Sequence, residues 1–309
     1  MVEQLHIDPQ ATLAGKRVLV TGGRGFVGAA LSARLRALGA LVYTVGRTPP
    51  AVTDDYQLVA DLQSAEATHE VFETVQPECV MHLASHVVGA RSLDVVLSTL
   101  HSNLTSTVNL LMAAKAHGCE RVVLTGSLEE PEPSLQWPVP SSPYAAAKLA
   151  AGAYGRMFNA LFELPVVILR VFMVYGPGPQ DVNKLVPYTI RSLLRGEQPQ
   201  FSSGTREVDW VYVADVAEAF LHAATAPDAA GGTFDVASGE LTSVRKVVEI
   251  IHELSNVSAM PEFGATQDRP LEQIRRADLS SSEQTLGWSP RTSLRDGLQS
   301  TIEWFSRES

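Results

Sequence analysis

Tyr144 and Lys148 have the residue types and the spacing of an acid–base pair. They lie four residues apart near the start of an expected helix over 143–163, and Pro143 suits the first turn of that helix. This spacing places both side chains on one helix face, where a lysine ammonium would favour the phenolate and lower the pKa of the tyrosine. Tyr144 would then serve as a general acid or base. The alternative is an exposed tyrosine beside a surface lysine.

Ser127 could act on the same substrate oxygen as Tyr144. It ends the segment Leu124-Thr125-Gly126-Ser127, which closes the strand expected at 121–125, one crossover before the helix with Tyr144 and Lys148. From that place Ser127 would donate a hydrogen bond to the substrate oxygen that Tyr144 protonates or deprotonates. We therefore take Ser127, Tyr144 and Lys148 as the catalytic candidates.

A glycine-rich turn, Thr21-Gly22-Gly23-Arg24-Gly25-Phe26-Val27-Gly28, directly follows the apolar run at 17–20. Gly22 allows a tight turn, Gly25 lets the backbone approach phosphates, and Gly28 lets helix and strand pack closely. The free N–H groups at the start of the next helix then form an anion site without a basic side chain. The pattern predicts dinucleotide binding, with an ordinary strand-to-helix turn as the alternative.

Arg47 bears on which dinucleotide would bind. The second expected strand, at 41–45, ends in Gly46-Arg47-Thr48, where an acidic residue would be expected to hold the adenosine ribose of NAD(H). An arginine there accommodates a 2′-phosphate, so the sequence favours NADP(H), with NAD(H) possible and a solvated surface arginine as the alternative. After the third strand, Asp61 and Leu62 could hold the adenine, although Asp61 could equally cap the following helix.

These residues need a scaffold of alternating strands and helices. Short apolar runs at 17–20, 41–45, 57–60, 79–84, 121–125 and 166–171 indicate strands buried on both faces of a parallel sheet. Helical patterns at 26–38, 64–75, 95–117 and 143–163 separate them. The expected fold class is therefore α/β, a doubly wound parallel sheet of the Rossmann type.

The pattern changes after the sixth strand, where Gly176-Pro177-Gly178-Pro179 interrupts it. Helices are expected at 184–195, 213–225, 243–254 and 294–307, mixed with short strands. We expect an N-terminal tail over 1–14, a dinucleotide-binding domain over 15–175, and a smaller C-terminal lobe over 176–309. The lobe would bind the substrate and return one segment to the first domain.

Composition excludes several classes of function. The net charge of −10 leaves no basic surface for nucleic acid, and no stretch of 18 apolar residues is present to span a membrane. The two cysteines indicate packing residues in a reducing compartment, and no signal peptide is apparent, so we expect a cytoplasmic protein. His82 and His86 lack a third ligand at regular spacing, which predicts no metal site.

Several further motifs accompany the glycine-rich turn and the Tyr144–Lys148 pair. They are His82-Leu83-Ala84 after the fourth strand, Asn103, Leu169-Arg170…Val174-Tyr175-Gly176-Pro177, Asp209-Trp210-Val211-Tyr212-Val213-Ala214-Asp215-Val216, and Leu286-Gly287-Trp288-Ser289-Pro290. With these, nearly the whole chain resembles the extended short-chain dehydrogenase/reductase family, in its group of nucleotide-sugar epimerases, dehydratases and ketoreductases.

The resemblance implies hydride exchange between nicotinamide C4 and a carbon of a nucleotide-diphosphate sugar, with Tyr144 handling the hydroxyl proton. It places Leu83, Ala84 and Ser85 at the cofactor. It also implies a homodimer formed through the helices at 95–117 and 143–163.

Departures from the family pattern concern the substrate side. Dehydratases of this group have an Asp-Glu pair after the catalytic hydroxyl, but this chain has Leu128 and Glu129, so dehydration is not expected. Glu129 could orient a substrate hydroxyl or be solvated. Met173 replaces an asparagine near the diphosphate, and Val208 replaces an arginine. The expected phosphate contacts are Arg206, which shares a strand face with position 208, together with Lys184 and Arg269.

The sequence thus favours an NADPH-dependent ketoreductase for a nucleotide-linked deoxysugar. A nucleotide-sugar 4-epimerase that uses the same three catalytic residues is the first alternative. Loss of the diphosphate site at Met173 and Val208 would instead indicate a reductase of a non-nucleotide ketone. A non-catalytic dinucleotide sensor is the last alternative, although it would not need Ser127, Tyr144 and Lys148.

Overall fold

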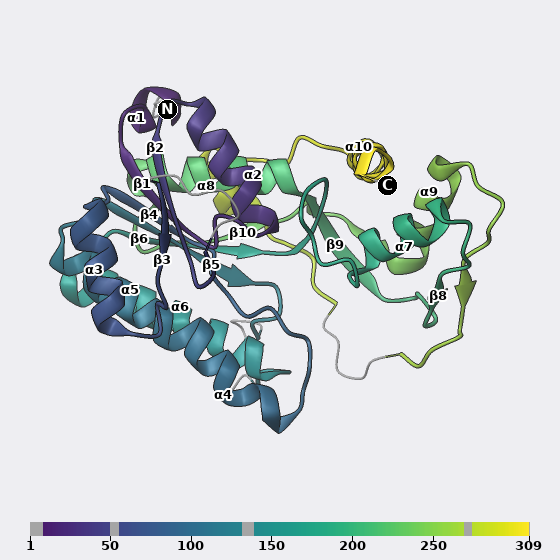
Figure 1. Ribbon diagram of the computed structural model, residues 1–309, viewed down its shortest axis with the longest axis horizontal. Helices are drawn as coiled ribbons and strands as arrows, with labels where there is room; N and C mark the ends of the chain where they lie inside the picture. The colour runs from purple at the N-terminus through teal and green to yellow at the C-terminus, as the bar shows by residue number, and fades with distance from the viewer. Residues whose placement is uncertain (1–8, 50–55, 132–138, 269–273, 309) are drawn as a thin grey trace.

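The computed structural model describes residues 9–49, 56–131, 139–268 and 274–308. Its centre is a seven-stranded, all-parallel sheet in the order β10-β6-β5-β4-β1-β2-β3 (Figure 1). The strands are β1 (Arg17–Thr21), β2 (Leu41–Gly46), β3 (Gln57–Val59), β4 (Cys79–His82), β5 (Arg121–Ser127), β6 (Val166–Val171) and β10 (Thr233–Val236). The strand order reverses direction at β1 and β4, so the doubly wound α/β prediction is confirmed.

Helices cover both faces of this sheet. One face is covered by α2 (Phe26–Ala37) and α8 (Val213–Thr225), and the other by α3 (Ala65–Val75), α5 (Ser106–Ala116) and α6 (Pro143–Phe162) (Figure 1). Neighbouring residues of one strand therefore enter different cores. Val18 and Val20 pack on the α2/α8 side, whereas Leu19 packs on the α3/α5/α6 side. This explains the unbroken apolar runs in the sequence.

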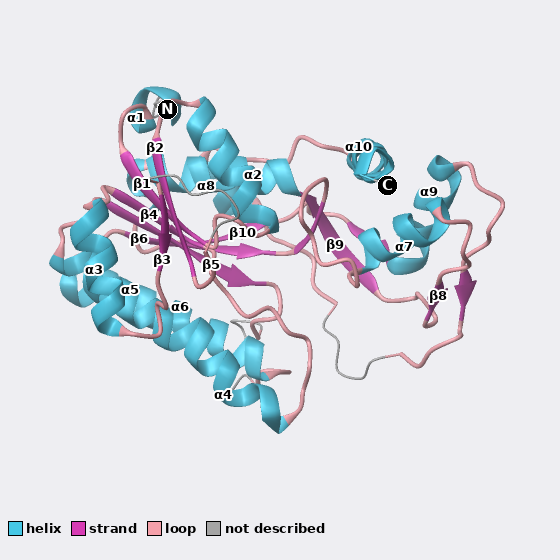
Figure 2. Ribbon diagram, in the orientation of Figure 1, coloured by secondary structure: helices cyan, strands magenta, loops and turns pink. Residues whose placement is uncertain are grey.

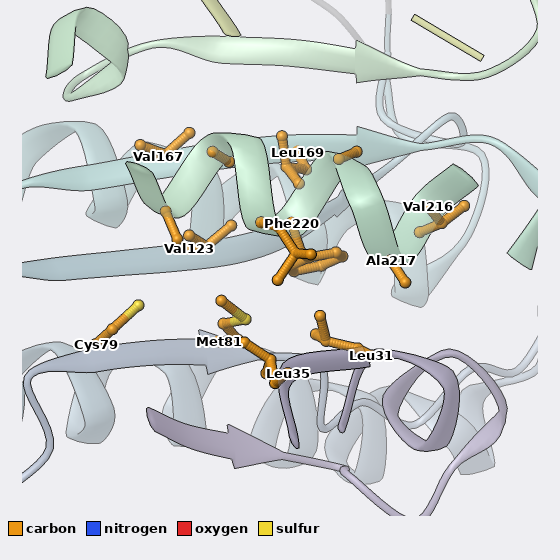
Figure 3. Packing of buried hydrophobic residues seen from close by; sticks show 14 of the residues in the cluster. Leu31, Leu35, Cys79, Met81, Val123, Val167, Leu169, Val216, Ala217 and Phe220 are labelled. Carbon is orange, nitrogen blue, oxygen red and sulfur yellow. The ribbon is translucent and has the colours of Figure 1, made fainter. Parts of the chain in front are cut away.

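The core on the α2/α8 side joins segments that are distant in the chain. The side chain of Phe220 points from α8 toward Leu31 and Leu35 of α2, over the apolar residues of the sheet (Figure 3). The N-terminal segment expected as a tail contains a short helix, α1 (Pro9–Leu13), and Leu13 is buried in this same core.

The helix expected at 95–117 is not uniform. It consists of a 3₁₀ turn (Leu93–Val95), α4 (Val96–Thr99), a π-helical segment (Leu100–Thr105) and α5. A π-helical turn accommodates an extra residue per turn and commonly occurs at functional sites. Here it contains Asn103, whose side chain reaches the loop that follows β4.

The C-terminal part forms a smaller lobe beside the carboxyl ends of the sheet (Figure 2). It contains two small sheets, in the orders β11-β9-β7 and β12-β8. Its elements are β7 (Met173–Tyr175), α7 (Leu185–Leu194), β8 (Gln200–Phe201), β9 (Glu207–Tyr212), β11 (Leu241–Ser243), α9 (Val244–Ser255), β12 (Glu262–Phe263) and α10 (Leu294–Glu308). Between these elements, α8 and β10 return to the large sheet.

Two further observations concern the helices and the cysteines. Among the described residues, none of the helices is both long and apolar enough to cross a membrane. Cys79 and Cys119 are buried free thiols, and burial raises the pKa of each to about 12, so both behave as packing residues.

Candidate active site

The glycine-rich turn lies between the end of β1 and the start of α2, and its shape depends on the glycines. A Cβ at Gly28 would lie 2.1 Å from the carbonyl oxygen of Gly22, and one at Gly22 would lie 2.8 Å from the backbone nitrogen of Ala84. Gly22 also has a φ of +69°. Gly25, the N-cap residue of α2, has no side chain to bind the first N–H groups of the helix. The turn thus has the form needed to hold a pyrophosphate.

A chain of hydrogen bonds ties this turn to β4. The Thr21 hydroxyl accepts from the backbone N–H groups of Leu83 and Ala84, at 3.1 and 3.0 Å, and bonds His82 Nδ1 at 2.8 Å. On the other side, His82 Nε2 bonds the hydroxyl of Thr107 at 3.1 Å. Since the Thr107 hydroxyl donates to the carbonyl of Asn103, His82 Nε2 must donate and its Nδ1 must accept.

His82 is therefore a neutral structural residue. Burial lowers its pKa to about 3, with a smaller contribution from the nearby Lys148 ammonium. Among the described residues there is no group of three or more side chains suited to hold a metal ion. The role of His82 in bracing the loop was missed from the sequence, where it was considered as a possible metal ligand and as part of the family motif His82-Leu83-Ala84.

A cavity lies at the carboxyl ends of β1, β2 and β4. Its lining includes these residues expected to bind the cofactor: Gly22, Arg47, Asp61, Leu62, Ala84 and Ser85. The cavity and the glycine-rich turn together fit a dinucleotide, with its adenosine half against β2 and the loop after β3. Phe26 and Val27 lie at the start of α2. Val27 packs on the core, and Phe26 lies beside Gly178 in the loop that follows β7.

The loop after β3 is fixed from α5. The amide of Asn109 donates to the carbonyl of Leu62 at 3.0 Å, which holds the cavity-lining Asp61 and Leu62 in place. Asp61 accepts from the backbone N–H of Gln63, whereas the N-cap of α3 is Ser64. Asp61 therefore does not cap α3, and this alternative from the sequence is wrong.

Two arginines mark the tip of β2. Arg47 is exposed at the rim of the cavity, where the sequence placed it. Arg24, from the glycine-rich turn, reaches the same tip and donates to the carbonyl and the hydroxyl of Thr48. A Cβ at Gly46 would lie 2.9 Å from Arg24 Nη2, so the glycine leaves room for this guanidinium. Arg24 was not singled out in the sequence, because a turn residue there has no strand register to indicate its direction.

Ser127, Tyr144 and Lys148 come together as expected. The N-cap residue Ser142 accepts from the backbone N–H of Ala145 and begins α6, which brings Tyr144 under the end of β5. All three catalytic candidates are buried, and the Tyr144 hydroxyl is hydrogen-bonded by the hydroxyls of Ser127 and Ser85. The Ser127 hydroxyl accepts from the backbone N–H of Glu129 at 3.2 Å, which leaves its own proton to be donated within the site, on the side of the Tyr144 hydroxyl.

The expected effect of Lys148 on the tyrosine is wrong for this structure. Lys148 Nζ donates to the carbonyl of Thr125 at 2.8 Å and lies 5.8 Å from the centre of the Tyr144 ring. Burial raises the pKa of Tyr144 to about 12, and the hydrogen bonds between its hydroxyl and those of Ser127 and Ser85 only partly oppose this rise. Burial also lowers the pKa of Lys148 to about 8. Tyr144 is a phenol at neutral pH and is suited to donate a proton.

Asn103 joins the two halves of the site. Its Oδ1 accepts from the backbone N–H of His86 at 2.7 Å and from the Ser85 hydroxyl at 3.1 Å, and its Nδ2 donates to the His86 carbonyl. Ser85 therefore connects Asn103 to Tyr144, in addition to lining the cavity. The sequence marked Asn103 only through the family resemblance.

The candidate substrate residues are less closely grouped. Glu129 is half-buried and accepts from the Ser142 hydroxyl at 3.4 Å, beside Tyr144, rather than being fully solvated. Leu128 stands at the position where dehydratases have an aspartate. It is buried against Phe172 and Ala277, so it does not face a substrate.

The other substrate candidates lie around the lobe. Met173 is half-buried on β7, Lys184 is exposed before α7, and Arg206 is half-buried before β9. Arg269 lies outside the described residues. Val208 is buried in the core of the lobe, so the arginine it replaces would not be accommodated there without a change of packing.

Comparison with known proteins gives the family. The model of the NAD-dependent epimerase/dehydratase family matches residues 18–237. The chain belongs to this family. It is 33% identical to a UDP-glucose 4-epimerase of Mycolicibacterium smegmatis, with 95% of this chain and 99% of that protein covered. It is 29% identical to a dTDP-L-rhamnose 4-epimerase of Burkholderia thailandensis, over 97% and 98% of the two chains.

Solved structures agree with the fold. MoeE5 in complex with UDP-glucose and NAD superposes with a TM-score of 0.84 at 32% identity, covering 94% of this chain and 99% of that one. The UDP-glucose 4-epimerase of Thermotoga maritima, with UDP-glucose, gives a TM-score of 0.86 at 26% identity and the same coverage. The protein is thus an extended short-chain dehydrogenase/reductase enzyme, as the resemblance in the sequence implied.

Proposed function

We propose that this family member reduces the ketone of a nucleotide-diphosphate sugar with NADPH. The choice of ketone reduction over epimerisation rests on Arg47, which lies at the rim of the adenosine cavity and favours NADPH. Beside it stands Gly46, and the sequence has no acidic residue at this strand end to hold an unphosphorylated ribose. Arg24 adds a second cation at the same tip. A 2′-phosphate would meet two guanidinium groups there, which suit a phosphate by charge and by planar hydrogen bonding.

The catalytic residues support the same direction. NADPH, when bound, supplies the hydride. Tyr144 holds its proton at neutral pH and can donate it to the ketone oxygen, while the Ser127 hydroxyl beside it can donate a hydrogen bond to the same oxygen. The Lys148 ammonium lies behind Tyr144 on α6 and would bond the nicotinamide ribose. Ketone reduction needs this one proton donation from the protein.

A 4-epimerase is the second candidate function. It is favoured by the 33% identity to a UDP-glucose 4-epimerase over nearly the whole chain. The same three residues could remove and return hydride at one sugar carbon, and the buried Leu128 leaves no acid for dehydration. A reductase of a non-nucleotide ketone would bind NADPH but neither UDP nor TDP. A sensor that only binds dinucleotide would have no turnover.

One experiment separates these functions. The purified protein is first examined by absorbance and fluorescence for bound cofactor and then titrated by calorimetry with NADPH, NADH, UDP and TDP. We expect an empty protein that binds NADPH more tightly than NADH and also binds a nucleoside diphosphate. NAD that survives purification would instead indicate the epimerase. Tight NADPH binding without any binding of UDP or TDP would contradict a nucleotide-sugar substrate.

We further propose a homodimer formed through α4, α5 and α6. Leu97 on α4, Met112 on α5 and Leu161 on α6 are large apolar side chains that are 64%, 57% and 69% exposed. Leu97 and Met112 lie along the helical run from α4 to α5, and both α4 and α5 pack beside α6. Apolar residues grouped in this way on neighbouring helices are typical of a protein interface, and a second copy offers the same surface by symmetry.

The dimer is tested by light scattering after gel filtration. We expect the wild-type protein to elute as a dimer and Leu97→Glu/Met112→Glu to shift it toward monomer, because two buried charges would oppose association. Met260→Glu, which changes a residue 62% exposed in the C-terminal lobe, is the matched control and should remain dimeric. A monomeric wild-type protein would contradict the proposed interface.

A further inference from the structure

Glu130 is a carboxylate buried directly behind the catalytic serine. Its side chain is only 5% exposed, although the neighbouring sequence, with Glu129 and Pro131, is typical of a solvated loop. Oε1 accepts from the backbone N–H of Ser127 at 2.7 Å, and the backbone N–H of Glu130 donates to the carbonyl of Ser127 at 3.1 Å. These two bonds close the turn that carries Ser127 and Glu129.

Two glycines lie beside this carboxylate, and the first of them leaves room for it. A Cβ at Gly126 on β5 would lie 2.7 Å from Glu130 Oε1, so a side chain there would displace it. A Cβ at Gly152 on α6 would lie 4.0 Å from Oε2. Gly152 stands one helical turn after Lys148 and one before Arg156 on the same helix face, so the carboxylate lies above α6 between these two cations.

We propose that Glu130 is a positioning residue, whose carboxylate fixes the turn bearing Ser127 and supplies the counter-charge that keeps Lys148 an ammonium. This inference rests on the proposed function of Ser127, Tyr144 and Lys148. A buried lysine alone would lose its proton readily, and a buried carboxylate alone would gain one. Held together in this site, each stabilises the charged form of the other.

The surrounding charges support this assignment. Burial raises the pKa of Glu130 above its usual value, and the hydrogen bond from the Ser127 N–H and the nearby cations Arg170 of β6 and Lys148 and Arg156 of α6 oppose part of that rise. Arg170 also donates a hydrogen bond from its Nε to Asp235 at 2.7 Å, so part of its positive charge is already neutralised. Burial lowers the pKa of Lys148, and Glu130 is the charge that raises it again.

Other titratable groups near Lys148 and Tyr144 do not replace this charge. His82 on β4 is neutral because its pKa is about 3. Glu129 is half-buried and acts on Tyr144 together with Glu130, both raising its pKa. Loss of the Glu130 charge should therefore lower the pKa of Lys148 and of Tyr144 alike, which moves both of their titrations to lower pH.

The decisive test does not depend on turnover. The chain has five lysines, so protein with ¹³C-labelled lysine gives few ε-carbon NMR signals, and Lys148→Arg identifies the signal of Lys148. We expect the Lys148 titration of Glu130→Gln to move to lower pH by about one unit relative to the wild type. An unchanged midpoint in folded Glu130→Gln would overturn the proposal, even if the catalytic function of the site were correct.

Kinetics and matched variants complete the test. If the enzyme turns over a keto sugar, the alkaline fall in kcat should move in the same direction in Glu130→Gln. Asp235→Asn removes another buried carboxylate that pairs with Arg170 and should leave the Lys148 titration unchanged. Glu130→Asp retains the charge and should give a smaller shift than Glu130→Gln. Equal shifts in the two Glu130 variants would contradict charge as the cause.

Discussion

The Tyr144→Phe variant is expected to lose turnover by a factor on the order of a hundred or more while its affinity for NADPH stays nearly unchanged. The hydroxyl that is removed is buried, is bound by Ser127 and Ser85, and is the proton donor of the proposed reaction. The ring that remains still packs under β5. Because only the reacting oxygen is lost, the effect should fall on kcat rather than on cofactor binding.

Steady-state kinetics with a keto sugar nucleotide and calorimetric titration with NADPH measure the two quantities separately. Tyr154→Phe is the matched control, since Tyr154 lies on the same helix α6 but is exposed. It should retain wild-type turnover. Equal loss of turnover and of NADPH affinity in Tyr144→Phe would show instead that Tyr144 has a structural role.

The large sheet could be predicted from the sequence because its signals are local. Each strand is buried on both faces, so the run Val18-Leu19-Val20 is apolar throughout, and the two cores take alternate residues from it. The glycine-rich turn is equally local, since Gly28 is required by the carbonyl oxygen of Gly22, only six residues earlier. The family motifs at Ser127, Tyr144 and Lys148 then located the candidate chemistry on this scaffold.

Interactions between distant segments could not be predicted in this way. The partner of Lys148 is the carbonyl of Thr125, and this depends on how α6 packs against β5 rather than on spacing along the helix. The burial of Glu130 likewise depends on its packing against α6, where it lies beside Gly152, 22 positions later. Spacing alone suggested that Lys148 lowers the pKa of Tyr144, but Lys148 bonds the Thr125 carbonyl instead, and burial raises the pKa of Tyr144.

Arg47→Asp should weaken the binding of NADPH relative to that of NADH. Arg47 lines the adenosine cavity at the end of β2, where a carboxylate would repel a 2′-phosphate but could accept hydrogen bonds from the ribose hydroxyls of NADH. We expect the ratio of NADPH to NADH affinity to fall by more than tenfold, which corresponds to over about 1.4 kcal/mol. Calorimetric titration of both cofactors measures this ratio directly.

The ratio of the two affinities is the informative quantity. A substitution that disturbs the shape of the cavity would reduce the affinity for NADPH and for NADH together and leave the ratio unchanged. Arg36→Asp makes the same change of charge at an exposed position of α2 that does not line the cavity, and it should leave the ratio unchanged. Arg24 keeps its contacts with Thr48 in Arg47→Asp, so residual NADPH binding would be attributed to it. An unaltered ratio in Arg47→Asp would remove the argument for NADPH and, with it, the structural reason for preferring ketone reduction over epimerisation.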